Sequence, residues 1–196
     1  VLFACLIGSA LLFYAGWELI IVGLLCVLFA FLYTTGPYPL SYNGWGDVLV
    51  IVFFGFVPVG GTYYVQALTW TSDTTVASLI CGLLIDTLLV VNNYRDREAD
   101  ARSGKRTVIV RFGEKFGRYL YLMLGVAASL LCFWFFFEGH LFAALLPLLY
   151  LIPHVLTWRR MVQIHSGKKL NSILGETSRN MLLMGILLSI GFLIRH

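Results

Sequence analysis

Charged residues are scarce in this sequence of 196 residues. Asp, Glu, Lys and Arg make up 12% of it, hydrophobic residues make up 59%, and the mean hydropathy is +0.85. Because a typical soluble domain contains about 25% charged residues, a water-soluble fold is excluded. The same composition excludes intrinsic disorder, since disordered chains bury too little apolar surface to offset the entropy lost on ordering.

Closely spaced cysteines are absent as well. Each of the four cysteines, at positions 5, 26, 81 and 132, is alone within an apolar stretch, and no two of them show the CxxC spacing of zinc or redox sites. We therefore predict that they are small membrane-buried side chains. The sequence begins at Val1 without an initiator Met or a basic segment, which argues against a signal peptide. We expect an N-terminally truncated chain.

Long apolar runs dominate what is present. A helix needs roughly 20 mostly apolar residues to cross a bilayer. Seven such runs are separated by short polar or Gly- and Pro-containing breaks: Val1–Ala15, Trp17–Thr35, Val48–Trp70, Thr74–Tyr94, Tyr119–Phe137, Leu141–Trp158 and Asn180–Ile194. The sequence predicts an all-α, polytopic transmembrane bundle of seven helices that forms a single domain over residues 1–196.

The basic residues lie almost entirely on one side of this predicted topology. Placing the helix ends alternately on two sides puts 13 of the 14 Lys and Arg residues together, and only Arg195 lies opposite. By the positive-inside rule the basic side is cytoplasmic. We therefore predict an integral membrane protein whose polar loops face the cytoplasm.

The most informative segment is NNYRDREADARSGKRTVIVRFG, residues 92–113, at the basic end of the fourth run. If the helix continues past Tyr94, then Asn92, Asp96 and Asp100 follow one another at intervals of four residues and share one helix face. Two carboxylates one turn apart repel each other unless a cation lies between them. Magnesium is commonly held by one or two carboxylates together with substrate phosphate oxygens, so this face is a candidate magnesium site.

A basic loop follows directly. Arg102, Lys105 and Arg106 flank Ser103 and Gly104, which allow a turn. Arg grips a phosphate with two parallel hydrogen bonds and Lys acts as a point charge, so this loop suits a phosphate group. The alternative is that these mixed charges form a solvated loop that only sets the topology.

The segment at residues 92–113 resembles the second aspartate-rich motif of the UbiA superfamily of membrane prenyltransferases, in its 1,4-dihydroxy-2-naphthoate polyprenyltransferase branch. A second stretch, YTTGPYPLSYNGWGDVLVIVFFG at residues 33–55, is similar to a loop of the same branch. The resemblance implies a nine-helix fold of which the seven runs correspond to helices three to nine. The family's first aspartate-rich motif would then precede Val1.

The resemblance also implies an activity and a set of site residues. The expected reaction moves a polyprenyl group from polyprenyl diphosphate to 1,4-dihydroxy-2-naphthoate, with loss of diphosphate and carbon dioxide, and yields demethylmenaquinone in menaquinone biosynthesis. The expected roles are Asp96 and Asp100 as Mg²⁺ ligands, Asn92 and Asn93 as polar catalytic support, and Lys105, Arg97 and Arg106 as diphosphate contacts. The resemblance further implies a location in a bacterial inner membrane, and no nucleic-acid partner is expected.

Asp86 lies about seven residues inside the fourth run, where an ionisable group is costly unless it faces a cavity or a partner. On a helix it shares nearly one face with Asn93 and Asp100. We interpret it as a contact to the aromatic substrate; the alternative is a hydrogen bond to a neighbouring helix.

Two other functions remain open at this point. The chain could be a UbiA-type enzyme that prenylates another aromatic acceptor. It could instead be a transporter segment whose loop binds phosphorylated ligands, which predicts polar groups at mid-membrane in several helices. Apart from Asp86 such groups are scarce.

Overall fold

The computed structural model describes residues 2–194, except for the side chains at positions 4 and 5. Helices account for the regular structure of these residues, and no strand occurs among them. The elements are α1 (Leu2–Ser9), α2 (Leu12–Ala15), α3 (Glu18–Thr34), η1 (Leu40–Tyr42), α4 (Gly46–Val50), η2 (Ile51–Gly60), α5 (Gly61–Ala67), α6 (Ser72–Arg102), α7 (Val108–Phe112), α8 (Glu114–Leu131), α9 (Trp134–Phe137), α10 (Leu141–Leu145), η3 (Leu146–Tyr150), α11 (Leu151–Ile164), η4 (Lys168–Leu170) and α12 (Asn171–Leu193). The predicted all-helical membrane fold is confirmed.

The structure differs from the prediction in how many of the runs make a full span. Within residues 2–194, five helices are long and apolar enough to cross a bilayer: Gly46–Ala67, Ser72–Arg102, Glu114–Phe137, Leu141–Ile164 and Lys168–Leu193. The first two runs form shorter apolar helices, Leu6–Ala15 and Glu18–Thr34. Seventeen residues at 1.5 Å each make α3 about 25 Å long, at the lower limit for a bilayer core.

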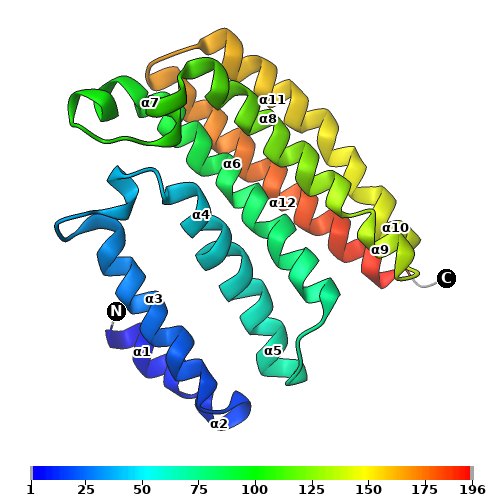
Figure 1. Cartoon of the computed structure of the whole chain (residues 1–196). Helices are drawn as coiled ribbons and strands as arrows, with labels where there is room; N and C mark the ends of the chain where they lie inside the picture. The colour runs from blue at the N-terminus through cyan, green and yellow to red at the C-terminus, as the bar shows by residue number, and fades with distance from the viewer. Residues whose placement is uncertain (1, 195–196) are drawn as a thin grey trace.

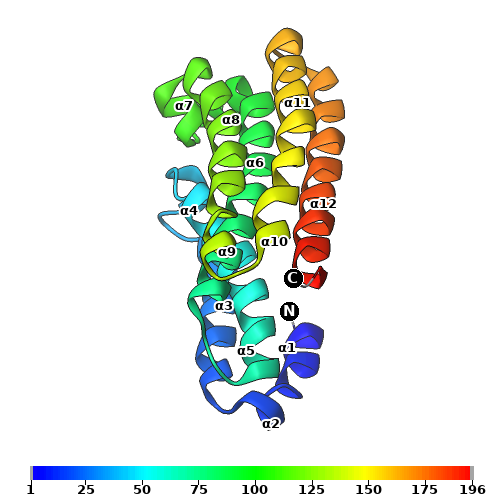
Figure 2. The ribbon, with the colours of Figure 1, turned by 90° about the vertical axis from the view of Figure 1, so that its right-hand side faces the viewer.

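Helix α6 occupies the centre of the molecule (Figure 1). It contacts α4 and η2 on one side and α8 and α12 on the other, and α11 packs outside α8 and α12. Figure 2 shows α6, α8, α11 and α12 with roughly parallel axes. Half of the apolar window of α6 is buried, the largest share among the five long helices. Other elements are therefore positioned relative to α6.

The close packing of η2 on α6 depends on glycine. A Cβ atom placed on Gly55 would lie 2.5 Å from the carbonyl oxygen of Ser78 and 2.7 Å from the Cα atom of Gly82. The segment Ile51–Gly60 is π-helical and contains Pro58, a residue that removes a backbone donor and perturbs regular helices. Small residues permit close approach of helix backbones in membranes, and this approach fixes the position of η2 beside α6.

Buried aromatic and polar side chains join α8, α11 and α12. The Tyr150 hydroxyl donates to Nδ1 of His154 at 2.9 Å, and Nε2 of His154 donates to the Leu122 carbonyl at 3.2 Å. The His154 ring also stacks on Tyr121, whose hydroxyl lies 3.0 Å from that of Thr177. His154 is thus a satisfied core residue that connects α11 to α8.

The cysteines agree with the prediction where they are described. Cys132 is fully buried, and Cys26 and Cys81 are half-buried free thiols. The side chain at position 5 lies outside the described residues.

Two helices extend further into the polar segments than the apolar runs predict. Helix α6 continues from the expected end at Tyr94 to Arg102, and α12 begins at Asn171 rather than Asn180. A helix satisfies its own backbone hydrogen bonds whether or not lipid surrounds it, so hydrophobicity marks the bilayer and not the helix end. The charged residues therefore lie on rigid helical extensions.

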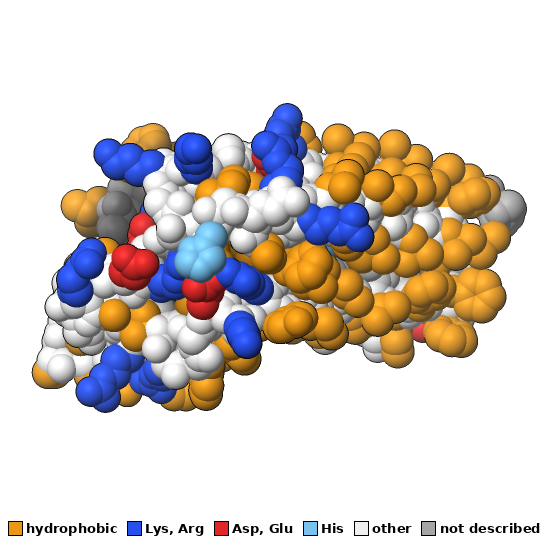
Figure 3. Space-filling view, turned by 90° about the horizontal axis from the view of Figure 1, so that it is seen from above, with side chains coloured by type: hydrophobic (Ala, Val, Ile, Leu, Met, Phe, Trp, Pro, Cys, Tyr) orange, Lys and Arg blue, Asp and Glu red, His pale blue; other side chains and the backbone are white. Residues whose placement is uncertain are grey.

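The surface has a charged part and an apolar part (Figure 3). Lys and Arg side chains gather over one region of this face, and hydrophobic side chains cover the remainder. This arrangement agrees with a bilayer around the apolar part and water at the basic end.

The predicted cytoplasmic location of the basic end can be tested by labelling. In a background without the native cysteines, we expect a cysteine at exposed Ser103 to react from the cytoplasm and one at exposed Glu138 to react from the opposite side. The measurement is accessibility to a membrane-impermeant maleimide in intact and inverted vesicles. Labelling of both positions from one side contradicts the topology.

The close packing of η2 is tested by Gly55→Ala, with Gly61→Ala in the same continuous helix as a matched control. Ala favours a helix over Gly by up to about 1 kcal/mol, but at position 55 the added methyl meets backbone atoms, whereas at position 61 nothing lies within 4 Å. We expect Gly55→Ala to lower the melting temperature of the detergent-solubilised protein and Gly61→Ala to leave it unchanged or raised. Equal effects of the two variants would refute the close approach.

Candidate functional site

Helix α6 begins and ends through identifiable local interactions. Its N-cap is Thr71, whose side chain accepts a hydrogen bond from the Thr74 N–H at 3.1 Å. At its other end the chain turns through Gly104, whose φ of +78° favours glycine. The Lys105 N–H then donates to the Asp100 carbonyl at 2.9 Å. The turn thereby places the Lys105 side chain next to Asp100.

A polar cavity of about 360 Å³ lies at this end of α6. The sequence-predicted residues Asn92, Asn93, Asp100 and Lys105 all line it. The remaining lining comes from the end of α3, the loop before α4, the start of α4, α6 itself and the turn after α6: Tyr33, Thr34, Ser41, Tyr42, Gly44, Gly46, Asp47, Leu89, Ser103 and Thr107. The two matched sequence stretches therefore meet at one cavity.

One backbone and one side-chain hydrogen bond hold the two stretches together. The Arg106 N–H donates to the Tyr42 carbonyl at 2.7 Å, and the Arg111 guanidinium donates to the Asn43 carbonyl at 2.7 Å. Arg106 itself is exposed, and its side chain lines neither the polar cavity nor the apolar cavity described below. Its predicted role as a diphosphate contact has no support from the cavity geometry, and the structure gives it a backbone role.

Asp100 presents an oxygen to the cavity that has no hydrogen-bond partner. Its Oδ2 atom is buried and unpaired by a hydrogen bond, and the Lys105 ammonium lies 3.4 Å from it. A buried carboxylate oxygen without a donor is costly, and a bound cation removes that cost. Within residues 2–194, no three His, Cys, Asp or Glu side chains gather closely enough to hold a metal. One or two carboxylates with phosphate oxygens nevertheless form a magnesium donor set, which Asp100 fits.

Asp96 has a different environment from the one predicted. The Arg95 guanidinium donates to both of its carboxylate oxygens, at 2.7 and 2.5 Å, and also to Oδ1 of Asn92 at 2.7 Å and Oδ1 of Asn171 at 3.0 Å. Asp96 lines neither cavity. Its neighbour Arg95, which sequence periodicity alone did not single out, neutralises it and ties α6 to the start of α12.

Arg97 points away from the polar cavity. It donates to the Tyr94 carbonyl at 2.7 Å, lies 4.5 Å from the centre of the Tyr94 ring and forms an ion pair with Glu114 at 3.4 Å. Glu114 also pairs with Arg118. Arg97 thus fixes α8 to α6, and its predicted contact with diphosphate has no support from this geometry.

Asp86 lies two helical turns before Asn93 and is 1% exposed. Its Oδ1 atom has no hydrogen-bond partner, and neither does Oδ1 of Asp47. Asp47 and Asp86 lie near enough for their negative charges to repel each other, and the Tyr33 hydroxyl lies within the range of both charges. The alternative of a hydrogen bond from Asp86 to a neighbouring helix is therefore not observed at Oδ1. Asp86 does not line the polar cavity, whereas Asp47 and Tyr33 do.

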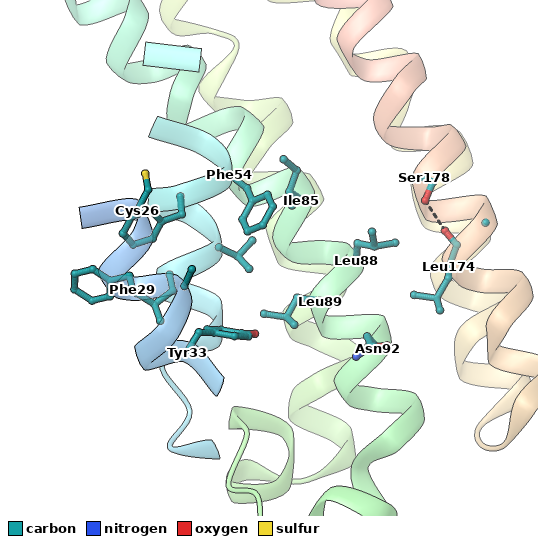
Figure 4. A pocket seen from close by; sticks show the side chains of 15 residues that line it. Cys26, Phe29, Tyr33, Phe54, Ile85, Leu88, Leu89, Asn92, Leu174 and Ser178 are labelled. Atoms are coloured by element: carbon teal, nitrogen blue, oxygen red, sulfur yellow. Dashed lines mark hydrogen bonds between the residues drawn. The ribbon is translucent and has the colours of Figure 1, made fainter. Parts of the chain in front are cut away.

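A larger, apolar cavity of about 880 Å³ adjoins the polar one. It lies between α3, α4–η2, α6 and α12 and is lined by Cys26, Phe29, Ala30, Tyr33, Leu49, Val50, Phe53, Phe54, Ile85, Leu88, Leu89, Asn92, Leu174, Gly175 and Ser178 (Figure 4). Tyr33, Leu89 and Asn92 line both cavities. A molecule with a charged head and an apolar tail fits this pair of cavities.

Sequence reasoning missed Tyr33, Ser41 and Asp47 as site residues. The sequence could have indicated these residues, since they lie within the second matched stretch and Asp47 directly precedes an apolar run. Their convergence on α6 depends on tertiary packing that the pattern does not show.

These observations define a class: a helical membrane protein whose charged pocket opens into an apolar cavity. The chain belongs to the UbiA prenyltransferase family, whose model matches residues 1–191. It is 38% identical over 181 residues to a 1,4-dihydroxy-2-naphthoate octaprenyltransferase of Haemophilus influenzae, an alignment that covers 88% of this chain and 56% of the relative.

Two further relatives are matched over smaller shares of both chains. A protein of the same description from Mycobacterium leprae is 43% identical over 63% of this chain and 42% of the relative. A UbiA prenyltransferase domain-containing protein 1 of Dictyostelium discoideum is 30% identical over 83% and 48%. The chain spans about half the length of these curated relatives. No solved structure gives a significant match to it.

Proposed function

We propose that this chain carries the prenyl-chain cavity and one diphosphate-binding wall of an enzyme that transfers a polyprenyl group from polyprenyl diphosphate to 1,4-dihydroxy-2-naphthoate, in menaquinone biosynthesis. The observation that carries the proposal is the junction of the polar and apolar cavities at Tyr33, Leu89 and Asn92. The names of the bacterial relatives favour the naphthoate acceptor over other aromatic rings. Family membership favours a transferase over a transporter segment.

In this proposal the diphosphate occupies the polar cavity. Lys105 supplies a positive charge, Asn92 and Asn93 supply amide donors, and Asp100 supplies a carboxylate for Mg²⁺. Asp96, one turn earlier on α6, is the second proposed ligand and would exchange its ion pair with Arg95 for the metal. When bound, magnesium would offset the negative charge that grows on the departing diphosphate. Fixed donors at this position stabilise the transition state more than the bound substrate.

The apolar cavity accounts for the other half of the substrate. The prenyl carbon–oxygen bond breaks as diphosphate leaves, and the allylic carbon forms a bond to the ring carbon that bears the carboxylate. That carboxylate then leaves as carbon dioxide, and its bonding electrons restore the aromatic ring. Phe29, Phe53 and Phe54 line the cavity, exclude water and present ring faces that attract positive charge.

The ring acceptor is proposed to lie near Asp47 and Tyr33. The unpaired Oδ1 atom of Asp47 is the proposed acceptor for a hydroxyl group of the dihydroxy ring. Since Asp47 lines the polar cavity and Asp86 does not, Asp47 is the direct contact to the ring in this proposal. Asp86 acts indirectly, through its charge near Asp47.

The metal role is tested by Asp100→Asn and Asp96→Asn, with Glu98→Gln as the control. Each removes one negative charge from α6, but Glu98 is exposed and lines neither cavity. In the full natural polypeptide we expect Asp100→Asn and Asp96→Asn to reduce magnesium-dependent turnover at least about 10²-fold, and Glu98→Gln to change it little. Near-normal turnover in either Asp variant, at matched expression, removes that residue from the site.

The prenyl cavity is tested by Ile85→Trp, which fills the apolar cavity near Cys26 and Phe54 (Figure 4). Leu130→Trp on the exposed face of α8 is the control. We expect kcat/KM for an octaprenyl diphosphate to fall about tenfold or more, equivalent to ~1.4 kcal/mol, while a geranyl donor is affected less. An equal loss for both donors would place the tail elsewhere.

A further inference from the structure

A third cavity lies outside the candidate active site, between α11 and α12. It has a volume of about 460 Å³ and is lined by Pro153, Leu156, Thr157, Arg159, Arg160, Gln163, Glu176, Arg179 and Asn180. Along α12 the residues that line the apolar cavity are at positions 174, 175 and 178, so Glu176 and Asn180 belong to another face. The prenyl transfer proposed above does not use this cavity.

The charges of this cavity are unequally paired. The Arg160 guanidinium lies 2.6 Å from Oε1 of buried Glu176, and the Thr157 hydroxyl donates to Oε2 of Glu176 at 3.4 Å. In contrast, Arg159 and Arg179 form no ion pair and no side-chain hydrogen bond with any residue from 2 to 194. The cavity therefore offers two unengaged guanidinium groups beside one neutralised ion pair.

Apolar side chains continue from the arginines along α11. Ile152, Leu156, Arg159 and Gln163 follow at intervals of four, three and four residues and so share one helix face. Ile152 is 63% exposed and Leu156 is 54% exposed. The face changes from apolar to basic between Leu156 and Arg159, as expected where a helix passes from the bilayer core to its interface.

Helix α12 repeats this change in the opposite chain direction. Arg179 is followed on the same face by Leu183 and Ile186, which are 36% and 47% exposed. The two helices thus present basic groups at the mouth of the cavity and an apolar strip below it. A soluble anion would use only the mouth, whereas a lipid would use both parts.

We propose that the cavity between α11 and α12 binds an anionic phospholipid. The headgroup phosphate is held by Arg159 and Arg179, whose planar forks form bidentate hydrogen bonds with phosphate oxygens. An acyl chain follows Leu156 and Ile152 towards the bilayer centre. Basic pockets between transmembrane helices at the interface are suited to anionic headgroups, and this site is separate from the diphosphate cavity.

The test is native mass spectrometry of the full natural polypeptide in neutral detergent with phosphatidylglycerol, phosphatidylcholine or glycerol phosphate. We expect retention of phosphatidylglycerol over phosphatidylcholine, and weak competition by glycerol phosphate. Arg159→Gln with Arg179→Gln should reduce phosphatidylglycerol retention at least about tenfold. Lys115→Gln with Lys168→Gln removes the same charge from exposed positions outside the cavity and should change it little.

Several outcomes overturn the proposal. These are unchanged phosphatidylglycerol retention in the arginine variant, equal losses in the arginine and lysine variants, equal retention of the two lipids, or glycerol phosphate competing as strongly as the lipid. Because neither arginine has a partner among the described residues, the double variant should keep its melting temperature. If the double variant melts at a lower temperature, the single variants Arg159→Gln and Arg179→Gln test the proposal instead. Each should lower phosphatidylglycerol retention while its melting temperature stays unchanged.

Discussion

Helix α6 runs unbroken from Ser72 to Arg102, and its rigid backbone connects the apolar interior to the charged end of the molecule. The same helix supplies Ile85 and Leu89 to the apolar cavity and Asn93 and Asp100 to the polar one. Because a helix fixes the rise between successive turns, the backbone of α6 sets the distance between the polar cavity and the apolar cavity. A break in α6 would separate the two cavities from each other.

Electrostatics at the end of α6 divides the charged residues into two groups. Arg95 and Arg97 form ion pairs with Asp96 and Glu114 and join α6 to its neighbours. Asp100 retains an oxygen without a donor and faces the polar cavity with Lys105. Asp100 and Lys105 thus place an unpaired carboxylate oxygen and a positive charge at the same cavity, which are the two charges that a bound metal diphosphate requires.

Periodicity predicted that Asn92, Asp96 and Asp100 share one helix face, and the family resemblance added Asn93. Of these four residues, Asn92, Asn93 and Asp100 line the polar cavity and Asp96 does not. The position of Lys105 near Asp100 could also be predicted, since a Gly-containing turn follows the helix directly. Tyr33 and Asp47 could not be predicted as site residues, because they reach α6 only through tertiary packing of the preceding segment. The pairing of Asp96 with Arg95 could not be predicted either, because it depends on side-chain conformation. The helix ends at Arg102 and Asn171 were misjudged by hydrophobicity, which reports the bilayer and not the backbone.

The central claim is that the two joined cavities bind one prenyl diphosphate, with its head at Asp100 and its tail beside Phe54. The most direct measurement is photo-crosslinking of the full natural polypeptide with a prenyl diphosphate that carries a diazirine at the distal end of its tail, followed by peptide mapping. The account predicts magnesium-dependent labelling of α3, η2 or α6 near Cys26, Phe54 and Ile85. Labelling confined to the outer face of α11 and α12, or labelling that excess inorganic diphosphate does not reduce, would contradict it.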